Sequence, residues 1–146
     1  MTTGTDSIHA LTEKTIYDIF NNGWTETSVQ FPGRELSNKN SLDEYINITI
    51  EPVFSDHETL NQADRRGIRR DYTLLIQTIV KKDNTGDRRL AVINDLLEVL
   101  LTEKIFPFED SDNSVVFKTA SPPRFVQNAE ESRYQKNITF DFYVRN

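Results

Sequence analysis

The segment RRGIRRDYTLLIQTIVKKDNTGD, residues 65–87, contains the clearest indication of the fold. Four arginines within its first six residues precede the apolar, strand-like run DYTLLIQTIV at residues 71–80. The next residues, KKDNTG, are typical of a turn, and Asp87 can cap the first amides of a following helix. The segment therefore predicts a long strand that leads through a turn into a helix.

Upstream of this strand the pattern predicts one helix and one further strand. Apolar residues at spacings of three and four mark a helix over residues 7–20, which the NNG triplet should end. Residues 24–44 show no clear periodicity and are expected to form a long loop. The stretch YINITI, residues 45–50, alternates with isoleucine on one face, and Pro52 should stop it. We expect this strand to pair antiparallel with residues 71–80.

Downstream, the pattern predicts a second helix and two further strands. The apolar stripe of the helix consists of Leu90, Ile93, Leu96, Leu97, Leu100 and Leu101. The sequence IFPFEDSDNS is expected to be a loop because Pro107 ends helical structure. Residues 115–120 and 134–145 are predicted strands, and the last of them alternates most clearly.

These elements predict an α+β fold in a single domain, residues 1–146, with the order αββαββ. The expected sheet is mostly antiparallel and four-stranded, with two helices packed on one face. The other face should be wet or covered by a partner.

Composition restricts the possible functions. The 146 residues carry 17 basic and 23 acidic side chains, for a net charge of −6. This balance argues against a dedicated nucleic-acid binder, because phosphate affinity needs a surplus of Lys and Arg. The absence of cysteine excludes disulfides, thiolate metal sites and a cysteine nucleophile. There is no signal-peptide pattern and no apolar run of about 20 residues, so a soluble cytoplasmic product without membrane contact is expected.

No motif in the sequence predicts catalysis, a cofactor or a metal. His9 and His57 lack metal-ligand spacing, and G-x-S-x-G, G-x-G-x-x-G and Walker patterns do not occur. The acidic stretch EDSDNS lacks the glycine and the late glutamate of a calcium loop. We therefore expect a protein that is not an enzyme.

The arginine-rich start of the quoted segment has two open interpretations. Arg65, Arg66, Arg69 and Arg70 lie among acidic residues that compensate much of their charge, and exposed pairs of this kind add little stability. Arginine is also enriched at interfaces, where its planar group can bind a neighbour's carboxylate. A solvated loop and an inter-subunit contact both remain possible at this point.

Taken together, these motifs resemble the tail terminator proteins of tailed bacteriophages, the lambda-type tail terminator and minor tail protein family. The resemblance begins with an N-terminal helix, a Phe-Pro loop (QFPGREL) and a strand that starts with tyrosine and ends near a proline. It continues with an Arg-x-Gly segment before a long strand and a turn that contains glycine. An acidic amphipathic helix and a final amphipathic strand complete it. The matching positions are residues 45–52, Arg66, Gly67, residues 72–80, Gly86, residues 90–101 and residues 134–145.

The resemblance implies a structural virion protein. Such a protein forms a homo-hexameric ring that caps the tail tube, ends tube polymerisation and joins the tail to the head-side neck. Its partners would be the tail tube protein and a neck or head-completion protein, and DNA would pass through its lumen without specific binding. It would be located in the host cytoplasm during assembly and then in the virion tail. The residues expected at subunit or tube contacts are Phe31, Arg34, Arg65, Arg66, Arg69 and Arg70.

Two alternatives stay open. A head-completion or neck connector protein would need similar surfaces and would also lack catalytic chemistry. A small metal-dependent nuclease, from a different class, would use carboxylates such as Glu51, Asp71 and Asp141 to bind Mg²⁺.

Overall fold

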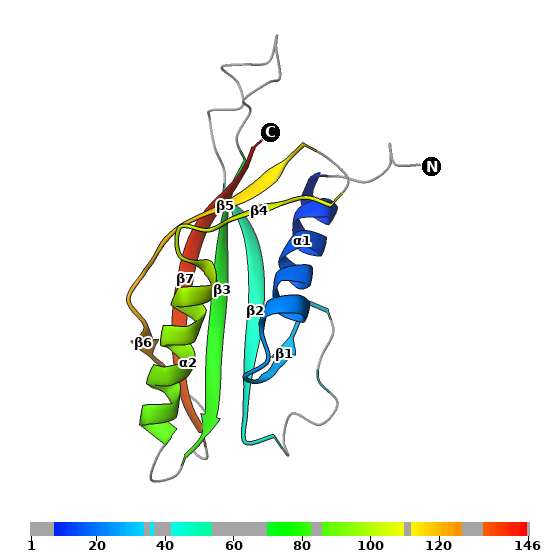
Figure 1. Cartoon of the computed structure of the whole chain (residues 1–146). Helices are drawn as coiled ribbons and strands as arrows, with labels where there is room; N and C mark the ends of the chain where they lie inside the picture. Colours follow the sequence, from blue (N-terminus) through cyan, green and yellow to red (C-terminus); the bar gives the residue numbers. More distant parts are fainter. Residues whose placement is uncertain are drawn as a thin grey trace.

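A computed structural model describes residues 8–33, 36, 42–53, 70–82, 86–109, 112–126 and 133–145. Two helices lie over one face of a single sheet (Figure 1). The elements in chain order are α1 (Ile8–Gly23), β1 (Ser28–Gln30), β2 (Glu44–Val53), β3 (Arg70–Lys81), α2 (Gly86–Leu101), β4 (Ile105–Pro107), β5 (Ser114–Ala120), β6 (Arg124–Phe125) and β7 (Arg133–Arg145).

Three long strands, β2, β3 and β7, form the middle of the sheet. The strand order is β1-β2-β3-β7-β5-β4, and β6 pairs with β7 beside this path. All pairs are antiparallel except β1 with β2, which is parallel. The chain is therefore an α+β protein with a mixed sheet, and the predicted pairing of β2 with β3 is confirmed.

The predicted four-stranded sheet is incomplete, because the described residues form a sheet of seven strands. The sequence did not reveal β1, β4 and β6, so the order is αβββαββββ and the predicted αββαββ is wrong in detail. Each of these strands is only two or three residues long, which is too short for an alternating pattern. They exist because each pairs with a longer neighbour.

Two prolines lie inside strands rather than outside them. Pro52 was expected to stop its strand but pairs with Tyr72 inside β2, and Pro107 was expected in a loop but ends β4. Proline is tolerated on the edge strands of a sheet. Within the described ranges, the outer edge of β2 is unpaired beyond Asn47, and β4 ends the strand order.

The core lies between the helices and the inward face of the sheet. The predicted apolar faces are buried there, including Ile16 and Phe20 from α1, and Leu90, Ile93 and Leu97 from α2. The strands contribute an aromatic cluster centred on Phe117, whose ring centroid lies 5.0 Å from that of Phe142, 5.9 Å from Phe106 and 6.2 Å from Phe140. This packing joins β4, β5 and β7 to one another on the core side of the sheet.

One polar pair lies inside this core. Thr78 of β3 donates a hydrogen bond from Oγ1 to Oδ1 of Asn94 in α2, at 3.2 Å, and both residues are buried. Asn94 Nδ2 has no partner among the described residues. An unpaired buried amide destabilises the fold by about 1–3 kcal/mol, so this pair is a weak point of the helix–sheet contact.

Gly86 is needed because a side chain has no room where α2 begins. A Cβ at this position would lie 2.7 Å from the carbonyl oxygen of Lys81 and 2.8 Å from Cδ2 of Tyr134. The residue is buried as the first residue of α2. The close approach of two backbones, rather than turn conformation alone, therefore requires glycine here.

Replacing Gly86 with alanine is expected to lower the free energy of unfolding by about 1–3 kcal/mol, because the added methyl overpacks the junction of β3, α2 and β7. Urea denaturation followed by circular dichroism would measure this loss. The matched control is Gly23→Ala at the end of α1, where the new Cβ meets only the flexible end of Leu100 at 3.2 Å. Equal losses at both positions would contradict this explanation.

Candidate interaction surfaces

The first candidate surface is the face of the sheet that lies opposite the helices. Strand residues that alternate with the core point to this face, and most are half-buried rather than fully exposed. No described helix covers it. This is the face that the sequence predicts to be wet or covered by a partner.

A row of amide side chains crosses this open face. Gln30 donates to Asn47 (Nε2 to Oδ1, 3.3 Å), and Asn47 donates to Gln77 (Nδ2 to Oε1, 2.6 Å). Asn137 continues the row in register with Gln77 and accepts from Gln135 at 3.0 Å. Hydrogen bonds within the row therefore link β1, β2 and β3, and Asn137 extends the row onto β7 by register alone.

Basic side chains outnumber acidic ones at the outward strand positions. The outward basic residues are Lys81, Lys118, Arg124, Arg133 and Arg145, and the outward acidic residues are Glu51, Asp71 and Asp141. The Nζ of Lys118 lies 5.8 Å from the ring centroid of Tyr143 on the same face. The net negative charge of the chain is therefore not carried by the open face.

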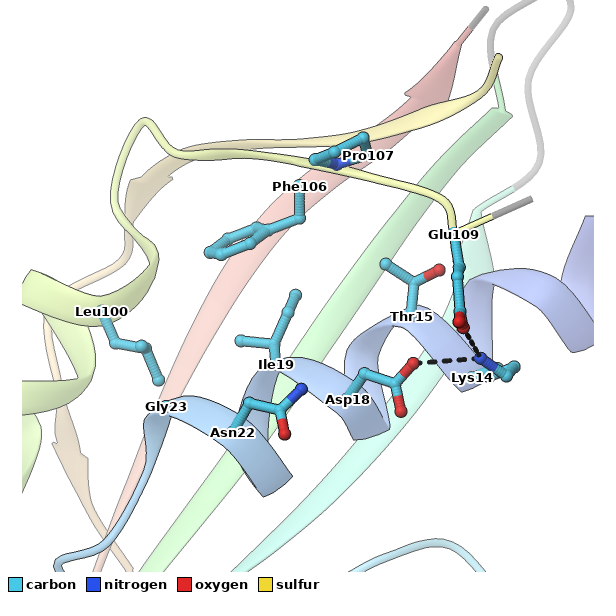
Figure 2. A pocket seen from close by; sticks show the side chains of 10 residues that line it. All are labelled: Lys14, Thr15, Asp18, Ile19, Asn22, Gly23, Leu100, Phe106, Pro107 and Glu109. Carbon is cyan, nitrogen blue, oxygen red and sulfur yellow. Dashed lines mark hydrogen bonds and ion pairs between the residues drawn. The ribbon is translucent and has the colours of Figure 1, made fainter. Parts of the chain in front are cut away.

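The second candidate surface is a groove on the helix side, with a volume of about 590 Å³ (Figure 2). It lies between α1, the end of α2 and β4. Ile19, Leu100 and Phe106 point into it and form an apolar floor. The groove is lined by Lys14, Thr15, Asp18, Ile19, Asn22, Gly23, Leu100, Phe106, Pro107 and Glu109.

An ion cluster occupies one end of this groove. Lys14 Nζ lies 2.8 Å from Oε2 of Glu109 and 3.1 Å from Oδ2 of Asp18. The hydrogen bonds to Glu109 and then Asp18 raise the pKa of Lys14 above its ordinary value. Because the cluster is exposed, it contributes little to stability. With one cation between two carboxylates, the rim of the groove keeps a net negative charge.

A second ion-pair cluster joins α2 to β2. Arg89 binds both carboxylate oxygens of Glu44, with Nε at 2.7 Å from Oε2 and Nη2 at 2.6 Å from Oε1. Nη2 of Arg89 also lies 3.3 Å from Oε2 of Glu26. Such a two-point contact is stronger than a single ion pair, and it raises the pKa of Arg89 further above its ordinary value. We assign it a structural role.

Only two of the expected contact residues lie in the described part of the chain. Phe31 is half-buried, and its ring centroid lies 4.7 Å from that of Tyr17, so it packs against its own domain more than expected. Arg70 is the first residue of β3 and is also half-buried. Arg34, Arg65, Arg66 and Arg69 lie outside the described residues.

The carboxylates considered for a nuclease lie near one another on the open face. Glu51 and Asp141 both flank Thr73 in the register, and Asp71 is two residues along β3 from Thr73. Thr73 donates to Asp141 at 3.2 Å. Among the described residues, however, no group of three or more histidines and carboxylates could hold a metal ion.

The groove has no signature in the sequence. Its carboxylates, Asp18 and Glu109, are far apart in the chain, and one follows the short strand β4 that has no sequence signature. The amide row could have been found in part, since Asn47, Gln77 and Asn137 all occupy polar positions in predicted strands. Aligning them required the register between the strands.

Comparison with known proteins supports the fold but no function. No protein-family model matches the chain, and no curated protein matches it. A solved structure whose name states no activity is similar over 95% of this chain and 94% of its own, with 14% sequence identity and a TM-score of 0.62. At this identity the likeness shows a shared fold alone. In the described ranges, neither helix has the length and apolar character to cross a membrane.

Proposed function

We propose that the chain is a structural protein of a tailed-phage virion, which forms a hexameric ring at the end of the tail tube. The ring would stop tube polymerisation and join the tail to the head-side neck. Its partners are further copies of itself, the tail tube protein and a neck or head-completion protein. The resemblance of the sequence motifs to the tail terminator family motivates this assignment.

The structural observation that supports the proposal is the presence of two unlike surfaces on one small domain. The open sheet face is broad and polar, whereas the groove beside α1 is apolar with an acidic rim. A closed ring needs heterologous contacts, in which one surface of a subunit binds a different surface of its neighbour. A ring at a tube end also needs axial surfaces for two partners.

In this function DNA passes through the lumen without specific binding. The net charge of −6 supports this, because affinity for phosphate comes from a surplus of basic side chains. Phe31, Arg34 and the arginines at positions 65, 66, 69 and 70 are proposed to contact the neighbouring subunit or the tube.

Native mass spectrometry of the purified chain, alone and mixed with the tail tube protein of the same phage, tests the proposal. We expect a hexamer alone or a hexamer that forms on the tube protein. A chain that stays monomeric and ignores the tube protein would overturn it. Binding to a neck protein but not to the tube would reassign the chain as a neck connector.

A further inference from the structure

The groove beside α1 has a chemistry that the fold itself does not use. Its floor is apolar, and part of this floor is Leu100 and Phe106, which are only partly buried. At the rim, Asp18 and Glu109 each bind Lys14 through one oxygen. No other described residue donates to the second oxygen of either carboxylate.

These features select a particular kind of ligand. A short segment that carries an apolar side chain could fill the floor, and flanking arginines could bind the free carboxylate oxygens at the rim. The second edge of β4 carries no strand in the described part of the chain. An extended segment could therefore also form backbone hydrogen bonds there, as in strand addition to a sheet edge.

The chain contains a segment with this composition. Residues 65–69 read Arg-Arg-Gly-Ile-Arg, so Ile68 stands between arginines on both sides. They belong to residues 54–69, which connect Val53 of β2 to Arg70 of β3. Residues 65–69 stand within five positions of Arg70, so the chain keeps them within about 18 Å of the start of β3. The groove of a neighbouring copy would therefore have to lie beside this end of the strand.

We propose that the groove lined by Asp18, Phe106 and Glu109 binds residues 65–69 of a second copy of this chain. The inference rests on the proposed ring. Ile68 enters the apolar floor, and Arg66 and Arg69 bind the rim carboxylates beside Lys14. Because the segment and the groove are different surfaces, the contact repeats around a ring and closes by rotation.

Charge reversal on the two sides of the contact tests this assignment. The groove variant is Asp18→Lys with Glu109→Lys, and the segment variant is Arg66→Glu with Arg69→Glu. The control variant is Asp95→Lys, which reverses an exposed charge on α2 outside the groove. Circular dichroism and thermal melting would verify that all variants fold, and native mass spectrometry would measure the hexamer.

We expect each reversal to weaken assembly at least about tenfold, because like charges then face each other at the contact, while the control assembles normally. A one-to-one mixture of the two variants should assemble again, since each variant segment then meets an oppositely charged groove on the other variant. This rescue occurs only if the contact joins different copies.

Other outcomes overturn the inference. If both variants formed normal hexamers, the proposed ring would stand, but the proposed contact between residues 65–69 and the groove would be wrong. If the hexamer returned only when all four substitutions were on one chain, and not in the mixture, residues 65–69 would bind the groove of their own chain. A wild-type chain that never assembles, alone or with the tube protein, would overturn the ring itself.

Discussion

Replacing Phe117 with alanine is expected to lower the free energy of unfolding by about 3–5 kcal/mol. Phe117 is 2% exposed and its ring touches three other aromatic rings, from β4 and β7. The substitution removes the apolar burial of the ring and leaves a cavity that the rigid strands around it can fill only in part. For a domain of this size the melting temperature should fall by about 10 °C.

Guanidinium denaturation and thermal melting would measure this loss. The matched control is Val99→Ala on α2, where the side chain is 72% exposed and the change should stay within about 0.5 kcal/mol. A Phe117→Ala variant as stable as this control would show that the aromatic cluster does not hold β5 against the rest of the sheet.

Replacing Asn94 with aspartate is expected to destabilise the protein by about 3 kcal/mol at pH 7, since it places a charge in the core without a cation. Among the described residues, the hydroxyl of Thr78 is the one hydrogen-bond partner of the Asn94 side chain. Burial should raise the pKa of the new carboxyl in the folded state above its unfolded value of about 3.9.

The sign of the pH dependence follows from that shift. Between the two pKa values the folded variant binds more protons than the unfolded chain, so its stability relative to wild type falls as pH rises. Below about pH 3 the carboxyl is largely neutral in both states, and most of the loss should disappear.

Denaturation of the variant and the wild type at several pH values would test this. The control Asn94→Leu removes the unpaired amide but leaves the Thr78 hydroxyl without an acceptor, so its loss should be about 1 kcal/mol and independent of pH. A loss in Asn94→Asp that does not change with pH would mean that position 94 is open to water.

The sequence by itself determined the long elements of the fold. Residues 45–50, 71–80 and 134–145 alternate because one side of each strand is buried, and the stripe from Leu90 to Leu101 repeats because α2 covers that buried side. These patterns arise locally, from the geometry of strands and helices, so they can be read without knowing what lies opposite. They were sufficient for the α+β class and for the pairing of β2 with β3.

Tertiary structure alone decided the short edge strands, the register and the candidate surfaces. β1 and β4 have no pattern of their own and exist through pairing with β2 and β5. Gly86 looked like a turn residue, but the carbonyl of Lys81 and the ring of Tyr134 are what exclude a side chain there. At the acidic rim Lys14 joins Asp18 to Glu109. The amide row runs from Gln30 to Gln77, with Asn137 next to Gln77 in the register. Such sites depend on distances between residues far apart in the chain, and those distances are fixed only when the core packs.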